Sequence, residues 1–317
     1  MKKKAQKVSA IAGIVAGSLA VMHLANKSIF FLSTMKESLY RNNQQYYDWR
    51  FGKICYTKTG SGTPLLLVHD LSSTGSNYEY KELERRLSKM HTVYSIDLIG
   101  CGQSDKPNIV YTNYLYVQLI QDFIKNVIKE ETTIIASRRS SAIAVMASYI
   151  DSSMIQRLVL INPSDLTDLN QCPKKKHKLL KALLDLPIIG TFIYNMTCSK
   201  KQISDRFKKE YLCNARPMGH YETAFCEAAH TSGAASKYLY TSVLCHYTNT
   251  NIVHALRTLQ TPILVLEGSN MAGGDRITNE YESYNSDLES VIIDHTKGMP
   301  HIEQPDSCYS VIEEFLS

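Results

Sequence analysis

A doubly wound α/β fold with a mostly parallel sheet is predicted by two observations, and a third adds a membrane anchor. Short apolar runs alternate with segments of helical periodicity on both sides of a long central segment. That central segment, residues 165–257, has helical periodicity only. An apolar stretch near the N-terminus precedes the whole pattern. We therefore predict four parts, namely an N-terminal anchor (1–34), a first part of the core (35–164), a helical lid (165–257) and a second part of the core (258–317).

The apolar stretch runs from Val8 to Ala25, which is close to the shortest helix that crosses a bilayer (~17–25 residues). A cleaved signal peptide is the alternative, because Ser18-Leu19-Ala20 resembles a cleavage site. The apolar character continues beyond that site, so an uncleaved transmembrane helix through residues 8–32 is preferred. Gly13 and Gly17 form a G-x-x-x-G pair through which two such helices could pack as a homodimer.

The charges around this segment predict its orientation. Lysines at positions 2, 3, 4 and 7 precede the apolar stretch. Positive residues favour the cytoplasmic side, so the N-terminus is expected in the cytoplasm and the body outside it. These four lysines also account for most of the net charge of +5. The remaining chain is nearly neutral, which argues against a nucleic-acid partner.

The core elements follow in order from their composition. Strands are expected where β-branched and apolar residues cluster, and the run at 64–69 is apolar throughout, as buried parallel strands require. Helices are expected where apolar residues recur at helical spacing. The expected strands are 50–57, 64–69, 92–97, 132–136, 157–162, 262–267 and 290–294, and the expected helices are 77–90, 111–129, 140–150 and 307–316. In such a sheet, ligands bind at the carboxyl ends of the strands, where we expect the lid to stand.

Two motifs carry a resemblance to a known family. The run Asp97-Leu98-Ile99-Gly100-Cys101-Gly102-Gln103-Ser104 follows one expected strand, and Pro64 to Asp70 contains another. These two motifs resemble the α/β-hydrolase family, and the resemblance extends to Thr132 to Val145, Pro262 to Gly268 and Lys297 to Leu316. With the N-terminal anchor, the chain resembles a membrane-anchored, bacterial-type member of that family. The resemblance implies an acyl substrate, a Ser-His-Asp triad, and no metal or cofactor. The eight cysteines are consistent with the expectation of no metal, since none has zinc-ligand spacing.

The positions that align with the family's triad carry other residues. Ala136 and Ser140 align with the two glycines of G-x-S-x-G, which places Arg138 on the nucleophile. Pro300 and Glu303 align with the proline and the glutamate of the family's C-terminal signature, which places Gly298 at the position of the catalytic histidine. The acid position falls at Met271. Because an arginine stays protonated, it cannot act as an acyl-accepting nucleophile, and the triad is read as degraded.

Two function hypotheses follow. The preferred one is a non-catalytic or strongly diverged member that binds a partner or a small ligand, for example an anion such as a carboxylate or phosphate. Its ligand site would comprise Asp70, Leu71, Arg138 and Arg139, with Asp70 either neutralising Arg138 or weakening the oxyanion hole to which the Leu71 N–H belongs. The alternative is an active esterase with a displaced triad. Its catalytic residues would be Ser140 (or Ser137), His301 (or His295) and Asp275.

Overall fold

The computed structural model describes residues 2–213 and 218–317. Met1, in the expected anchor, and residues 214–217, in the expected lid, lie outside the described residues. The described body is built on one eight-stranded sheet in the order β1-β2-β4-β3-β5-β6-β7-β8. The strands are β1 (Gln44–Trp49), β2 (Gly52–Thr59), β3 (Pro64–Val68), β4 (Thr92–Ile96), β5 (Thr132–Ser137), β6 (Ile155–Ile161), β7 (Ile263–Gly268) and β8 (Glu289–Ile293).

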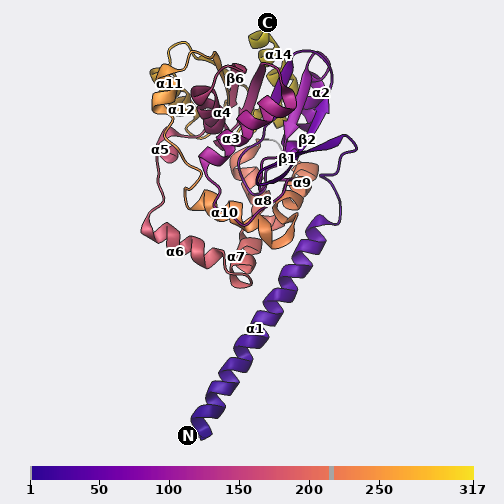
Figure 1. Cartoon of the computed structure of the whole chain (residues 1–317), viewed down its shortest axis with the longest axis vertical. Helices are drawn as coiled ribbons and strands as arrows, with labels where there is room; N and C mark the ends of the chain where they lie inside the picture. Colours follow the sequence, from indigo (N-terminus) through magenta and orange to yellow (C-terminus); the bar gives the residue numbers. More distant parts are fainter. Residues whose placement is uncertain (1, 214–217) are drawn as a thin grey trace.

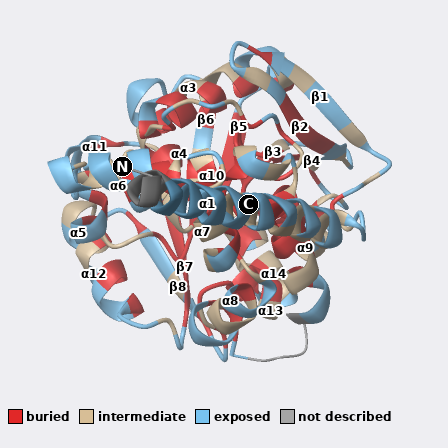
Figure 2. Ribbon diagram, turned by 90° about the horizontal axis from the view of Figure 1, so that it is seen from below, coloured by how far each residue is buried: buried red, intermediate tan, exposed pale blue. Residues whose placement is uncertain are grey.

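All neighbouring strands from β4 to β8 are parallel, and β1 and β2 add an antiparallel hairpin at one edge. Helices cover both faces of the sheet (Figure 2). Strand β3 shows why both faces need cover. Leu66 and Val68 pack in the main core with α3 and α4, while Leu65 and Leu67 pack in a second core with α2 and α14. The mostly parallel α/β architecture predicted from the sequence is confirmed.

The helices of the body are α2 (Lys81–Leu87), α3 (Asn113–Phe123), α4 (Arg139–Ile150), α5 (Leu166–Leu169), α6 (Lys175–Leu184), α7 (Ile189–Thr197), α8 (Lys200–Arg206), α9 (Met218–His230), α10 (Lys237–Leu244), α11 (Val253–Thr258), α12 (Gly274–Tyr284), α13 (Pro300–Glu303) and α14 (Pro305–Leu316), with short 3₁₀ or π turns η1 (Asn77–Tyr80), η2 (Ile124–Ile128), η3 (Phe207–Tyr211) and η4 (Gly233–Ser236).

Helices α5 to α10 form a helical insertion between β6 and β7 (Figure 1). Its own core includes Phe207, Tyr211 and Phe225. The same cluster contains Tyr78, which follows β3, and Met299, which follows β8. The insertion therefore packs directly on the loops at the carboxyl ends of the strands.

Helix α1 (Lys2–Thr34) leaves the body as a single long rod (Figure 1). Its segment Ser9–Thr34 is long and apolar enough to cross a membrane, with a mean hydropathy of 1.5, and almost none of its apolar window is buried. Its main contacts with the body are with α7 and α9, and its partly buried residues begin at Leu19.

Candidate functional site

The candidate site lies where β3 and β5 end side by side. Val68 pairs with Ala136 in the parallel register. Asp70 and Arg138 each follow two residues later, so the register brings their side chains together. The Nε atom of Arg138 lies 3.6 Å from Oδ2 of Asp70. Asp70 and Arg138 therefore form an ion pair, as one of the alternatives drawn from the sequence requires.

Arg138 has the backbone of a sharp strand-to-helix turn, with φ 50° and ψ −116°. Few non-glycine residues adopt a positive φ, and such strain is typical of functional sites. The turn is possible because its two outer residues, Ala136 and Ser140, are small and fully buried. The Ser140 hydroxyl donates to the His69 carbonyl oxygen at 2.5 Å, which ties α4 to the loop after β3.

The Asp70 carboxylate also occupies the N-terminus of α4. Its Oδ1 accepts the Arg139 N–H at 3.2 Å, while Oδ2 faces the Arg138 guanidinium. Burial is the largest single influence on the Arg138 guanidinium and acts to lower its pKa, but Asp70, followed by Tyr211, Glu210 and Glu79, together raise the pKa of Arg138. The helix N–H and the guanidinium thus already hold one anion, supplied by the chain itself.

His69 fixes this loop. Its Nδ1 contacts the Asp70 carbonyl oxygen at 2.8 Å, and its Nε2 lies 3.1 Å from the Leu98 N–H, which must donate to it. Because Nε2 accepts, Nδ1 carries the proton and the ring is neutral. The Leu71 side chain is buried in the main core beside this loop.

Gly298 faces the same guanidinium from the loop after β8. A Cβ built on Gly298 would lie 2.2 Å from the Glu210 carbonyl oxygen and 3.0 Å from Arg138 Nη1. The Arg138 guanidinium lies over the Tyr211 ring, with 5.0 Å between Cζ and the ring centroid. Arginine and the insertion together fill the space that a side chain at position 298 would need.

The other predicted catalytic residues lie apart. His301 is fully buried, and its Nε2 lies 3.1 Å from Oε1 of Glu79. Ser140 is bonded to a carbonyl instead, so the structure does not bring Ser140 and His301 together. Asp275 is exposed in the first turn of α12, and His295 is exposed on the loop after β8.

Ser137 belongs to a buried polar cluster that the sequence did not predict. Its hydroxyl donates to Oε1 of Glu79 at 2.5 Å, the same oxygen that His301 contacts. Oε2 of Glu79 accepts the Asp70 N–H at 3.1 Å. The carboxylate therefore lies between serine and histidine, whereas a triad needs the histidine in the middle. Glu79, Glu210 and Tyr211 lie in segments without a motif, so no sequence signal marked them.

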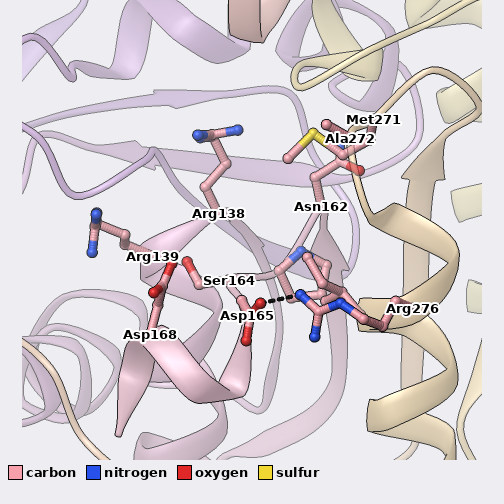
Figure 3. Close-up of a pocket in the computed structure, with 11 residues that line it drawn as sticks. Arg138, Arg139, Asn162, Ser164, Asp165, Asp168, Met271, Ala272 and Arg276 are labelled. Atoms are coloured by element: carbon pink, nitrogen blue, oxygen red, sulfur yellow. Dashed lines mark hydrogen bonds and ion pairs between the residues drawn. The ribbon is translucent and has the colours of Figure 1, made fainter. Parts of the chain in front are cut away.

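Two cavities flank the arginines. The first, of about 240 Å³, includes Asn162, Met271 and Arg276, and Figure 3 shows Arg138 and Arg139 pointing to different sides of it. Arg276 is already paired with Asp165 there (Figure 3). The second, of about 290 Å³, lies between the turn and the insertion and is lined by Arg138, Arg139, Arg206, Asp70, Glu210, Tyr211, Tyr240, Val243, Leu244, His246 and others. No group of three or more His, Cys, Asp or Glu side chains in the described parts of the chain could hold a metal ion.

Comparison with solved structures identifies the fold. The chain is similar to a serine hydrolase involved in carbazole degradation, with a TM-score of 0.70 and 17% identity over 86% of this chain and 98% of that one. It is also similar to a probable hydrolytic enzyme from Pseudomonas aeruginosa PAO1, with a TM-score of 0.73 and 16% identity over 88% and 95% of the two chains. The chain has the α/β-hydrolase fold.

Sequence relatives agree with this fold over short segments. A hydrolase of 2-hydroxy-6-oxo-6-(2'-aminophenyl)hexa-2,4-dienoic acid from Metapseudomonas resinovorans is 26% identical over 35% of this chain and 39% of its own length. An uncharacterized protein of Mycobacterium tuberculosis is 29% identical over 34% of this chain. The match spans only 31% of that mycobacterial protein. No protein-family model matches the chain.

The sequence aligns Arg138 with the nucleophile of the α/β-hydrolase family and Gly298 with its histidine, and this alignment stays a prediction. The structure places Arg138 on a strained turn between β5 and α4, with a positive φ. The N–H of the next residue, Arg139, binds the Asp70 carboxylate. Gly298 lies on the loop after β8.

Proposed function

We propose that this chain is a catalytically silent α/β-hydrolase-fold protein that is tethered to a membrane and binds a small anionic ligand. The position of Asp70 is the main observation in support of the absence of catalysis. Its carboxylate accepts the Arg139 N–H and pairs with Arg138, so a negative charge of the chain occupies the place where an oxyanion would form. A donor that is already bound to a carboxylate cannot stabilise a developing oxyanion.

An assay of ester hydrolysis tests the silent part. We expect the full-length chain to hydrolyse p-nitrophenyl butyrate no faster than its Ser140→Ala and Ser137→Ala variants. The competing function, a serine hydrolase with a displaced triad, has the named hydrolases among the sequence relatives in its favour. It predicts turnover that is lost in one serine variant, and that result would refute the proposal.

The ligand part of the proposal is supported by the cavity between the turn at Arg138 and the insertion. Three arginines face two carboxylates there, and one of these carboxylates is already paired with Arg138. Arg138 Nη1 is buried and has no hydrogen-bond partner among the described residues. A carboxylate or phosphate would satisfy this nitrogen and the Arg139 guanidinium. A cavity of about 290 Å³ is at the small end of ligand sites, which favours a compact anion over a long acyl chain.

Titration calorimetry with acetate, butyrate and inorganic phosphate tests the ligand part. We expect at least one of these anions to bind the full-length chain and Arg139→Gln to weaken that binding by about tenfold. Arg257→Gln, an exposed arginine of α11, is the matched control and should bind like the parent. Absence of heat with all three anions, or equal affinity in Arg139→Gln, would contradict the assignment.

The membrane tether is supported by α1. A long apolar helix that the body leaves uncovered needs an apolar environment. The fold similarity to a membrane phospholipase A includes this helix, since it covers 100% of this chain at a TM-score of 0.67 and 17% identity. The leading lysines favour a cytoplasmic N-terminus. Gly13 and Gly17 face open space, as a homodimer of this helix would require.

A further inference from the structure

The corner formed by α6 and α7 carries apolar side chains that nothing in the body covers. Helix α6 buries Lys181 and Leu184 toward the insertion and leaves its other leucines exposed. The corner bends by 98°, so both helices contribute to one surface. Its exposed apolar residues are Leu179 (75% exposed), Leu180 (36%), Leu183 (47%), Leu186 (41%), Ile189 (41%) and Met196 (44%). An uncovered apolar cluster of this kind usually marks an interaction site.

Positive charges border this apolar surface. Four lysines lie in or just before the first turn of α6, and all four are exposed. No acidic residue occurs between Leu169 and Leu184 to balance them. Leucines on one side of a helix with lysines beside them are typical of helices that lie in a membrane interface, where apolar groups enter the acyl boundary and lysines contact anionic headgroups. The four lysines are Lys174, Lys175, Lys176 and Lys178.

The length of α1 places this surface at the level of a bilayer. Asn26 is the first described residue of α1 with a buried side chain, and it bonds to the Ile188 carbonyl oxygen and to Asn195. Both partners belong to the α6–α7 corner. The apolar stretch from Val8 to Ala25 is about 27 Å long, compared with a hydrocarbon core of ~30 Å. Its residues are exposed from Ser9 to Ser18, whereas Leu19, Met22 and Ala25 are half-buried ahead of Asn26. A bilayer that holds this stretch therefore reaches the corner.

The same arrangement is visible in the two overall views. Helices α6 and α7 form the edge of the body from which α1 leaves (Figure 1). The view from that side shows α1 running obliquely across the front of the body, over α7 (Figure 2). The corner is also firmly held, because Lys181 Nζ donates to Thr241 and Lys237 Nζ donates to the Leu186 carbonyl oxygen. The apolar surface is therefore a fixed part of the insertion.

We propose that the α6–α7 corner is a second membrane contact, in which its leucines and Ile189 enter the interface of an anionic bilayer and the four lysines contact the headgroups. This inference rests on the proposed membrane tether, because α1 sets the distance. With this second contact, the helical insertion faces the membrane surface. The wall of the cavity that α10 forms then faces the membrane as well.

Fluorescence quenching by brominated lipids tests the contact. The full-length chain is placed in vesicles of phosphatidylcholine and phosphatidylglycerol with brominated acyl chains, and tryptophan is introduced by Leu183→Trp or, separately, Leu179→Trp. The chain has a single native tryptophan, whose signal in the unsubstituted chain is subtracted. We expect the added emission to fall by roughly twofold or more. Met90→Trp, at an exposed position after α2 that lies away from the corner, is the matched control and should keep its emission.

Ile14→Trp in α1 separates the two proposals. If Ile14→Trp is quenched and both corner variants are not, the tether stands and the second contact is refuted. If none of the three is quenched, both are refuted. A corner that associates with a second copy of the chain, seen as concentration-dependent cross-linking without quenching, also refutes the inference. Replacement of the four lysines by glutamine should reduce the quenching at position 183 in these vesicles.

Discussion

Arg138 and Asp70 stabilise each other at the turn between β5 and α4. A guanidinium at the N-terminus of α4 is opposed by the helix dipole by ~0.3–1 kcal/mol. The Asp70 carboxylate reverses this, because it accepts the Arg139 N–H and faces the guanidinium from the neighbouring strand end. Each residue alone would leave a partly buried charge without its partner.

A double-mutant cycle with Arg138→Met and Asp70→Asn measures this dependence. We expect a coupling free energy of about 1–3 kcal/mol in urea unfolding, since both side chains are largely buried. The control is the more accessible pair of Arg85, which is exposed, and Glu82, which is half-buried, and it should couple by less than about 0.5 kcal/mol. Equal coupling in both pairs would mean that the ion pair of Asp70 and Arg138 has no special role.

Glu79 is the second residue on which the site depends. Burial acts to raise its pKa, but the hydrogen bond and charge of His301, with help from Ser137, hold the pKa of Glu79 below its usual value. A carboxyl group whose pKa is lowered by folding stabilises the protein above its unfolded pKa. That stabilisation is lost as the pH falls through the folded value.

Glu79→Gln should therefore destabilise the chain at pH 7 by about 2–3 kcal/mol, because one buried acceptor loses its charge. The difference from the parent should narrow as the pH falls below about 4.3, where the carboxyl group of the unfolded parent becomes protonated. Denaturant unfolding across this range measures it. Glu314→Gln, exposed on α14, should change the stability by less than about 0.5 kcal/mol at any of these pH values. A constant difference between parent and Glu79→Gln would contradict the role of the charge.

At the level of elements, strands β2 to β8 and the core helices α3, α4 and α14 follow closely from the sequence, because buried apolar runs and helical periodicity are local signals. Strand β1 was not predicted, since Gln44 to Trp49 is mostly polar and exists through its pairing with β2. Helix α12 was not predicted either, because its composition is polar. The register between β3 and β5 could be inferred from the family motifs, and with it the meeting of Asp70 and Arg138. The cluster around Glu79 could not, because it joins three distant segments.

The contact between the insertion and the loop after β8 is an element-level feature that mutation can test. Gly298 touches the Glu210 carbonyl oxygen of η3, so any Cβ there requires a backbone shift. We expect Gly298→Ala to lower the free energy of unfolding by about 1–3 kcal/mol. Gly219→Ala, in open space on α9, should instead be neutral or raise it by about 0.5–1 kcal/mol. If Gly298→Ala were as stable as the parent, the expectation that the insertion leaves no room for a side chain at position 298 would be contradicted.

The whole molecule combines an α/β-hydrolase fold with a strained turn at Arg138 and an uncovered apolar helix. The insertion and Arg138 fill the space beside Gly298, the position that the sequence aligns with the family's histidine. Helix α1 and the α6–α7 corner lie on one side of the body (Figure 1). The fold does not decide the activity, since function resides in the side chains of the site.

Labelling of the full-length chain with a fluorophosphonate probe tests the silent site most directly, because the probe reacts with any activated serine whatever the substrate. We expect no labelled peptide by mass spectrometry, since the Ser140 hydroxyl donates to the backbone carbonyl of His69 and the Ser137 hydroxyl to the Glu79 carboxylate, and neither bonds to a histidine ring of the described residues. Labelling at Ser140 or Ser137 that is lost on heat denaturation would contradict it.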